Sequence, residues 1–308
     1  MEPGVLPARK EQAVPEETIA LTGVTGGIGS RVAHTLIRQG YSPRLLARDS
    51  SKARGFFKHE IVECSYDDRP SMAEALIGAS SLLFVSGREH VDRLEHHRSV
   101  ISAASEADIR KIVYTSFIGA HPKATFTLAR QHYETEQLIR QSGVEFVILR
   151  DSMYSDYLPF LAGADGVIKG PAGSGRASFV TRDDVAESAV AVLTTDAFDG
   201  QTFDITGPEA ISMREAAALL SEISGREISY VQESAEEAYA SRAHYGAPEW
   251  EVEGWVSSYQ AIANGEMEAM SNAVETLTFH QARTVREFLT ANPESYAHLR
   301  GNGAGASP

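Results

Sequence analysis

The sequence predicts an α/β fold in which a doubly wound parallel sheet of six to seven strands is followed by a smaller, mostly helical C-terminal lobe. Two observations support this class. From Thr18 onward, short apolar runs alternate with segments whose apolar residues recur at helical spacing. Residues 226–299 are instead mostly helical in character. Strands separated by helices form parallel sheets covered on both faces, with right-handed crossovers.

Seven of the apolar runs have the length and composition of buried strands. They lie at residues 19–22, 44–47, 60–63, 81–85, 111–115, 145–149 and 202–205. Gly40 and Gly143 follow two of the helical patterns, where a residue in the left-handed conformation ends a helix. Ser212 and Glu215 have the spacing of a capping box, and Gly225 follows the helix that they begin.

Composition and charge exclude several classes of function. The 308-residue chain carries a net charge of −14, which disfavours a sequence-independent grip on nucleic acid. No apolar stretch approaches the length that crosses a bilayer, and the N-terminal residues lack the pattern of a signal peptide. The single cysteine, Cys64, permits no internal disulfide. We therefore expect a cytoplasmic protein without membrane or direct nucleic-acid partners.

The most informative segment is residues 22–30, which has four glycines in nine residues. It follows the first strand and opens a helix. Such a loop makes a tight turn, brings a pyrophosphate against backbone N–H groups, and lets the helix pack on the sheet. We therefore predict a Rossmann-type NAD(P)-binding domain. The loop residues expected to bind the cofactor are Gly23, Thr25, Gly26, Gly27, Ile28 and Gly29.

The end of the second strand discriminates between NADPH and NADH. An acidic residue there would bind the ribose hydroxyls, whereas a cation would meet a 2′-phosphate. Arg48 lies nearest the strand end, and Lys52 adds a second cation. Asp49 is well placed to cap the next short helix. We expect the cofactor to be NADPH, with NADH as the alternative.

These patterns divide the chain into two folded units and two tails. The predicted units are an NAD(P)-binding domain at 17–153 and 176–210 and a substrate lobe at 154–175 and 211–299, with flexible tails at 1–16 and 300–308.

Four segments make the sequence resemble the atypical short-chain dehydrogenases and, within them, the NmrA-like group. They are Thr22-Gly23-x-Thr25-Gly26-x-Ile28-Gly29, Leu46-Ala47-Arg48-Asp49, Tyr114-Thr115-Ser116 and Leu149-Arg150-Asp151-Ser152-Met153-Tyr154. The group includes NAD(P)H:quinone oxidoreductase type 2, the triphenylmethane dye reductases and the NmrA transcriptional co-regulators. The resemblance covers about residues 17–292, and the segments around His132 and Tyr154 make it closest to the quinone and dye reductases.

The resemblance also points to a missing acid. Short-chain dehydrogenases generally use Tyr-x-x-x-Lys, in which the tyrosine protonates the substrate oxygen. Here Leu128 lies at the tyrosine position and His132 at the lysine position. Hydride transfer to a quinone or a cationic dye needs no such acid, because the resulting charge is delocalised or cancelled. The missing pair equally suits a protein that binds nucleotide without catalysis.

The resemblance makes His132 and Tyr154 the candidate catalytic residues. His132 is expected to bond the nicotinamide ribose or to face the acceptor; the alternative is a helix histidine satisfied by a neighbour. Tyr154, and with less support Tyr157, is expected to stack on or hydrogen-bond an aromatic acceptor, with packing as the alternative.

Ligands of such folds lie at the carboxyl ends of the strands, which adds further cofactor contacts. Ser65 is expected near the adenine. The segments after the fourth and fifth strands contribute Val85, Ser86, Gly87, Thr115, Ser116 and Phe117. Ser116 aligns with the usual catalytic serine of the wider family, and without its tyrosine partner we expect it only to position the ligand.

Two clusters of polar side chains are interpreted as structural, and no metal site is predicted. Residues 89–98 carry three histidines but no His-Glu-x-x-His motif. We expect a solvated helix there, with Glu89 and Arg93 one turn apart. Asp183 and Asp184 are expected to cap a helix and to favour its positive end.

The combined prediction is an NAD(P)H-dependent oxidoreductase that transfers hydride to a quinone-like or other electron-poor aromatic acceptor. Two alternatives stay open: a non-catalytic NADP(H)-sensing regulator with a protein partner, and a tailoring reductase for one aromatic metabolite. A homodimer is also compatible with the sequence.

Overall fold

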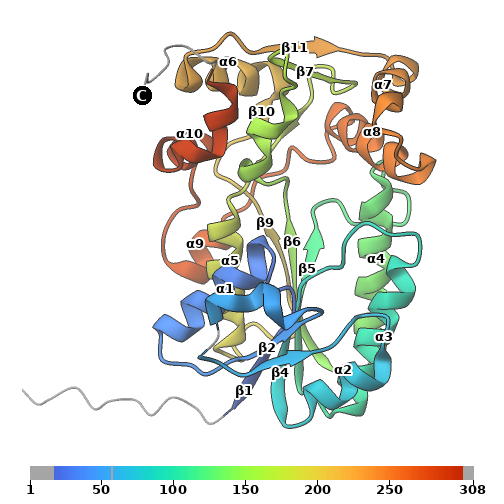
Figure 1. Cartoon of the computed structure of the whole chain (residues 1–308), viewed down its shortest axis with the longest axis vertical. Coiled ribbons are helices and arrows are strands. Elements are labelled where there is room, and N and C mark those ends of the chain that lie inside the picture. Colours follow the sequence, from blue (N-terminus) through green and yellow to red (C-terminus); the bar gives the residue numbers. More distant parts are fainter. Residues whose placement is uncertain (1–16, 57, 301–308) are drawn as a thin grey trace, which may run out of the picture.

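The computed structural model describes residues 17–56 and 58–300, so the predicted tail at 1–16 and residues 301–308 lie outside the described residues. The chain folds around one seven-stranded, all-parallel sheet with the strand order β3-β2-β1-β4-β5-β6-β9 (Figure 1). The strands are β1 (Thr18–Leu21), β2 (Arg44–Ala47), β3 (Ile61–Glu63), β4 (Ala79–Phe84), β5 (Lys111–Phe117), β6 (Glu145–Asp151) and β9 (Thr202–Ile205). The predicted α/β class and its seven strands are confirmed.

Helices cover both faces of this sheet. One face carries α1 (Gly27–Arg38), α5 (Arg182–Leu193) and α9 (Ala273–Thr278), and the other carries α2 (Arg69–Leu76), α3 (Arg93–Glu106) and α4 (Thr127–Gln141) (Figure 1). The alternation along β1 explains how one strand serves both layers. Ile19 and Leu21 belong to the core beneath α1, whereas Ala20 belongs to the core beneath α2 and α3.

The predicted helix ends are confirmed. Gly40 and Gly143 have φ values of 91° and 77°, which a side chain would strain. Ser212 and Glu215 form a complete capping box at the start of α6 (Met213–Ser224), and Gly225 ends that helix with φ 74°.

A smaller lobe lies beyond the carboxyl ends of β5 and β6 (Figure 1). It has its own apolar core, to which Leu158, Phe179, Met213 and Leu289 contribute. Its helical elements are η2 (Ser155–Leu161), α6, α7 (Ala235–Arg242), η3 (Ala243–Tyr245), α8 (Glu249–Ala263), α10 (Val285–Ala291) and η4 (Pro293–Leu299). Its short strands are β7 (Val167–Gly170), β8 (Arg176–Ala177), β10 (Ile211–Ser212) and β11 (Ser229–Gln232), which pair as β7 with β11 and β8 with β10.

The strand order determines where a ligand can enter. The order reverses between β1 and β4, so the connections from these two strands leave toward opposite faces and open a crevice at their carboxyl ends. The helices of the described residues include none that is long and apolar enough to cross a bilayer.

Candidate functional site

The glycine loop forms one wall of the crevice between β1 and β4. Gly23 has φ +66°, and a Cβ atom on it would lie 2.9 Å from Cβ of Val85. A Cβ atom on Gly29 would lie 2.4 Å from the carbonyl oxygen of Gly23. The backbone N–H of Gly26 donates to that same oxygen at 2.8 Å. These contacts explain why the turn from β1 into α1 requires glycine at both positions.

The start of α1 presents unpaired hydrogen-bond donors. Gly26 caps the helix in an extended conformation and offers no side-chain acceptor. Across residues 17–56 and 58–300, no protein acceptor bonds the backbone N–H of Gly27, Ile28 or Gly29. The first turn of α1 contains no acidic side chain either. Open N–H groups at a helix N-terminus bind anions, so the loop fits the diphosphate of a dinucleotide.

The predicted adenosine end lies at the carboxyl ends of β2 and β3. Arg48 is exposed and forms no hydrogen bond or ion pair with the described residues. Lys52 lies 3.6 Å from Asp49, whose carboxylate accepts the N–H of Ser51 at 3.0 Å. Asp49 therefore serves the short helix η1 (Ser50–Phe56), as predicted, and leaves Arg48 available for a phosphate. The hydroxyl of Ser65 donates to Asp67, two residues further on.

The segment after β4 forms the other wall of the crevice, and hydrogen bonds hold its backbone firmly. The N–H of Val85 donates to Oγ1 of Thr22 at 2.9 Å. The N–H of Ser86 donates to Oγ1 of Thr115, also at 2.9 Å. Thus three of the predicted contact residues are brought together by side chains at the ends of β1 and β5.

His97, from α3, supports the next residue of this wall. The N–H of Gly87 donates to Nε2 of His97 at 2.9 Å. Nδ1 of His97 lies 2.9 Å from Oγ1 of Thr135, whose own proton goes to the carbonyl oxygen of Gln131. His97 is therefore neutral, with its proton on Nδ1. Burial, and then the nearby Arg93, lower the pKa of His97 well below its usual value.

The predicted catalytic residue His132 is enclosed by protein partners. Its side chain is 7% exposed. Nε2 lies 3.0 Å from Nη2 of Arg93, and Nδ1 lies 3.0 Å from the hydroxyl of Tyr114. Because a guanidinium only donates, Nε2 accepts and Nδ1 carries the proton. Burial, and then Arg93 and His97, lower the pKa of His132 well below its usual value. The arrangement favours the alternative of a histidine satisfied by its neighbours.

Arg93 joins His132 to the crevice wall, and sequence reasoning missed this role. Its Nε donates to the carbonyl oxygen of Gly87 at 2.9 Å, and its side chain is 3% exposed. Within the described residues no carboxylate forms an ion pair with it. The expectation of a solvated helix fails at Arg93, because α3 begins there and buries it, and Glu89 precedes the helix, whereas Glu95 and Arg98 are exposed as expected. The tertiary contacts with α4 override the exposed pattern of the segment.

The side chain of Ser116 is also hydrogen-bonded within the protein. Its hydroxyl donates at 2.6 Å to Oε1 of Glu136, which is completely buried. Arg150 pairs with both oxygens of this carboxylate, at 2.8 Å and 2.7 Å. The hydroxyl proton of Ser116 therefore points into the protein, while its oxygen retains a lone pair that can accept a hydrogen bond.

Tyr154 lies at the junction of the sheet and the smaller lobe. Its hydroxyl donates to Oδ2 of Asp151 at 2.9 Å. Asp151 is 1% exposed, and among the described residues its Oδ1 has no partner. Burial raises the pKa of Asp151 well above its usual value. The guanidinium of Arg182 lies over the rings of Tyr154 and Tyr157, at 5.1 Å and 4.5 Å from their centroids.

The two aspartates after Arg182 have a different role from the predicted cap. Thr181 is the N-cap of α5, and its Oγ1 accepts the N–H of Asp184. Asp183 and Asp184 lie in the first turn, where their charges favour the helix as expected. Asp184 is buried and pairs with Arg283, a contact across 99 residues of sequence that no local pattern announces.

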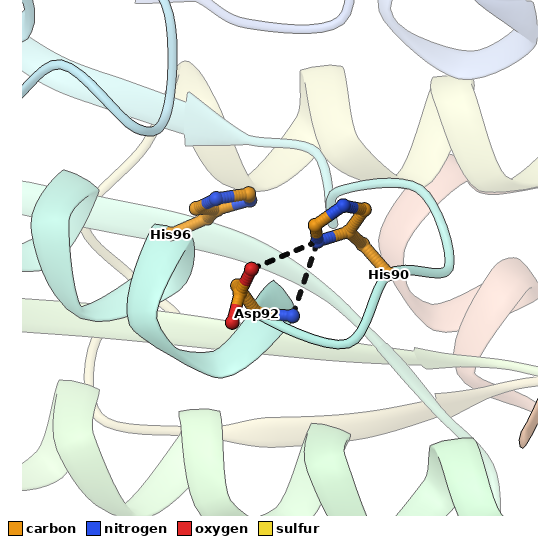
Figure 2. Close-up of side chains that lie close together, drawn as sticks. All are labelled: His90, Asp92 and His96. Atoms are coloured by element: carbon orange, nitrogen blue, oxygen red, sulfur yellow. Dashed lines mark hydrogen bonds and ion pairs between the residues drawn. The ribbon is translucent and has the colours of Figure 1, made fainter.

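The histidines of residues 89–98 give no preformed metal site. Figure 2 shows the exposed cluster of His90, Asp92 and His96, whose candidate ligand atoms lie within 4.8 Å of one another. The two imidazole rings stack at 5.2 Å with an interplanar angle of 23°. A metal ion must lie in the plane of each ligating ring, which nearly parallel stacked rings do not allow. Nδ1 of His90 is also occupied, since it accepts the N–H of Asp92 at 3.1 Å.

Comparisons with known proteins agree with the class that the crevice defines, a dinucleotide-binding protein. The model of an NAD(P)H-binding family matches residues 23–196. The chain therefore belongs to this NAD(P)H-binding family. The relatives described in the next paragraph are NAD(P)H-dependent reductases, and this chain is an enzyme of the same kind.

Three relatives are similar over most of their length. Quinone oxidoreductase 2 of Escherichia coli is 30% identical over 87% of this chain and 96% of its own. Its crystal structure with NADPH has a TM-score of 0.82, covering 89% of this chain and 99% of that one. An NAD(P)H azoreductase of Xenophilus azovorans is 28% identical over 90% and 99%. The triphenylmethane reductase of Citrobacter sp. with NADP(H) is 28% identical over 89% and 99%, with a TM-score of 0.79.

The predicted kinship with quinone and dye reductases is thus confirmed, and so is a nicotinamide cofactor. The crystal structure of a double mutant of NmrA is only 15% identical, with a TM-score of 0.71, so it shows the fold alone.

Proposed function

We propose that this protein transfers hydride from NADPH to a quinone-like or other electron-poor aromatic acceptor, without a tyrosine acid. The observation that carries the proposal is that the polar side chains near the expected position of the acceptor already form hydrogen bonds to other protein groups. His132 has both ring nitrogens bonded to protein, and the hydroxyl of Ser116 donates to a buried carboxylate. Leu128, at the tyrosine position of the resembling family, cannot donate a proton.

This arrangement matters because acceptors differ in their need for a proton. A simple ketone becomes an alkoxide on reduction and requires an acid in contact with its oxygen. A quinone becomes an anion whose charge spreads over the ring, so water can protonate it after the reaction. When bound, NADPH supplies the hydride, and the protein contributes binding, orientation and electrostatics.

Each part of the site has a role in this proposal. The open N–H groups of Gly27, Ile28 and Gly29 hold the diphosphate, and Arg48 with Lys52 meets the 2′-phosphate. Ser65 lies on the adenine side. The rigid wall at Val85, Ser86 and Gly87 and the strand end at Thr115, Ser116 and Phe117 position the nicotinamide side. Tyr154 and Tyr157 contact the acceptor through their aromatic faces.

Arg93 adds an electrostatic contribution from behind the wall. Its guanidinium is buried and unpaired with any carboxylate of residues 17–56 and 58–300, and it bonds the carbonyl oxygen of Gly87. In a site of low dielectric constant, a buried positive charge without a directly contacting carboxylate favours negative charge that develops on a nearby acceptor. His132 is a positioning residue in this scheme, because it holds the guanidinium of Arg93.

The test is a comparison of acceptors. The protein is mixed with NADPH and with either a series of quinones or a series of aliphatic ketones, and the absorbance of reduced nicotinamide is followed. We expect oxidation of NADPH with quinones and none with ketones. Gly26→Val is the control variant, because its side chain crowds the diphosphate while the extended backbone at residue 26 accommodates it. Equal turnover of ketones, or none with any quinone, would contradict the proposal.

A further inference from the structure

The side chain of Arg182 lies on the glycine loop, directly beside the proposed diphosphate site. A Cβ atom on Gly27 would lie 2.8 Å from Cδ, 2.9 Å from Nε and 3.1 Å from Cζ of Arg182. Gly27 is the first residue of α1 and Arg182 is the first residue of α5. The two helix starts thus meet face to face, although 155 residues separate them in the sequence.

This position is electrostatically unfavourable for a cation unless an anion joins it. The N-terminus of a helix carries a partial positive charge, and at α1 its N–H groups have no protein acceptor among the described residues. The nearest carboxylate, Asp156, lies 3.7 Å from Nη1 of Arg182, which is longer than a hydrogen bond. That carboxylate also lies 3.4 Å from Arg31, which pairs more closely with Asp183, at 2.7 Å. Among the described residues the guanidinium of Arg182 therefore has a single carboxylate partner, and that partner lies beyond hydrogen-bond distance.

Two aromatic rings provide the rest of its stabilisation. The guanidinium carbon lies 4.5 Å from the centroid of Tyr157 and 5.1 Å from that of Tyr154. The two rings are 6.3 Å apart and inclined by only 27°, so they offer a shared aromatic surface that Arg182 covers. A cation over an aromatic face is held more weakly than one paired with a phosphate. Tyr157 is 53% exposed, so a ligand can reach it from solvent.

We infer that Arg182 couples the two ligands of the proposed reductase. When the diphosphate binds at the start of α1, the guanidinium leaves the rings of Tyr154 and Tyr157 and pairs with the phosphate oxygens. Its departure uncovers the aromatic surface, which then receives the acceptor. Before the cofactor binds, Arg182 and a planar aromatic acceptor compete for the same faces. The cofactor therefore binds first and increases the affinity for the acceptor. This inference rests on the proposed function, because it assumes an aromatic acceptor at these tyrosines.

The experiment measures binding rather than turnover. Oxidised NADP⁺ carries no hydride to transfer, so its complex with a naphthoquinone is stable. The dissociation constant of the naphthoquinone is measured by quenching of intrinsic fluorescence, with and without saturating NADP⁺. For the wild type we expect NADP⁺ to tighten naphthoquinone binding about 5- to 10-fold, and naphthoquinone to tighten NADP⁺ binding by the same factor, as linkage requires.

In Arg182→Ala we expect this coupling to disappear. The naphthoquinone should bind equally with and without NADP⁺, at close to the affinity of the wild-type NADP⁺ complex. NADP⁺ should bind about 10- to 100-fold more weakly, since a charge-assisted contact is lost. Arg182→Lys retains the charge but not the planar group, and should show intermediate coupling. Arg286→Ala is the matched control, because Arg286 pairs with Glu222 on the surface of the smaller lobe and should leave both values unchanged.

The outcomes separate this inference from the proposed function. Retained coupling or unchanged NADP⁺ affinity in folded Arg182→Ala would overturn the inference. So would a wild-type protein whose naphthoquinone affinity ignores NADP⁺. If the wild type binds no quinone at all, the proposed quinone-like acceptor is refuted, and the coupling is refuted with it. Weakened NADP⁺ binding in Arg182→Ala would in that case still place Arg182 at the diphosphate. Circular dichroism verifies folding, and Arg182→Gln replaces the alanine variant if that one does not fold.

Discussion

The start of α1 and the cluster between β4, α3 and α4 lie at the same edge of the sheet, but their polar groups are satisfied in opposite ways. At α1 the donors are backbone N–H groups, and those of Gly27, Ile28 and Gly29 have no acceptor in the described part of the chain. In the cluster of Arg93, His97 and His132, every histidine nitrogen has a protein partner.

This difference separates the binding of a ligand from the shaping of its site. An open helix N-terminus gains hydrogen bonds when an anion arrives, so it attracts the cofactor. A closed side-chain network gains nothing directly from a ligand, but it holds the wall at Gly87 rigid. Four substitutions test the comparison, in order of decreasing expected effect.

Gly29→Ala should disrupt the turn itself. The new Cβ would lie 2.4 Å from O of Gly23 and 2.6 Å from O of Thr22, and backbone atoms cannot move aside as a flexible side chain can. We expect the free energy of unfolding to fall by about 3 kcal/mol or more. Urea denaturation followed by circular dichroism measures it. Gly26→Ala is the control, since its Cβ meets one oxygen at 3.3 Å and its φ of −103° suits alanine; equal losses in the two variants would refute the packing argument.

Arg48→Glu should change which cofactor the open site prefers. Replacing the free cation by an anion should weaken NADPH more than NADH, by on the order of 1–3 kcal/mol. Titrating each reduced cofactor against the protein by its fluorescence gives both dissociation constants. An equal loss for the two cofactors would show that Arg48 does not contact the 2′-phosphate.

His97→Gln should make the fold less sensitive to acid. His97 is neutral in the folded protein with its pKa lowered, so below a pH of about 6.5 the unfolded state binds more protons and stability falls as pH falls. Each such histidine contributes a slope of up to about 1.4 kcal/mol per pH unit. The raised pKa of Asp151 acts in the opposite direction, but it is common to wild type and variant. Urea denaturation is repeated at pH values from about 7 to about 5, the range in which an ordinary histidine titrates. The free energy of unfolding should fall less steeply with pH in the variant than in the wild type. Parallel curves of unfolding free energy against pH would mean that His97 is charged when buried.

His132→Gln should have the smallest effect of the four. Glutamine can still accept from Arg93, so we expect kcat with a quinone to fall by less than about tenfold, whereas loss of a general acid costs about 10²- to 10⁴-fold. Steady-state oxidation of NADPH measures it, and His132→Leu, which cannot hold Arg93, should lose more. If kcat of the glutamine variant instead falls by about 10³-fold, His132 acts as a proton donor after all.

The fold was largely predictable because its signals are local. The apolar runs of β2 and β9 matched the observed strands at both ends, and β5 and β6 matched at their first residues. Their last two residues escaped prediction, because Ser116 and Asp151 are polar yet buried: Ser116 bonds Glu136, 20 residues away, and Asp151 bonds Tyr154. The glycine loop was recognisable for the same local reason: the turn, the open donors and the helix lie within nine consecutive residues.

The sequence by itself determined the alternation of strands and helices, the turn into α1 and the cation that follows β2, because each depends on neighbours within a few residues. Only the tertiary structure decided that Arg93 is buried behind Gly87, that His132 is enclosed, and that Arg182 lies on Gly27. Those contacts join segments separated by up to 155 residues, and a side chain's partners across such a distance depend on how the packed helices meet, which no local pattern encodes.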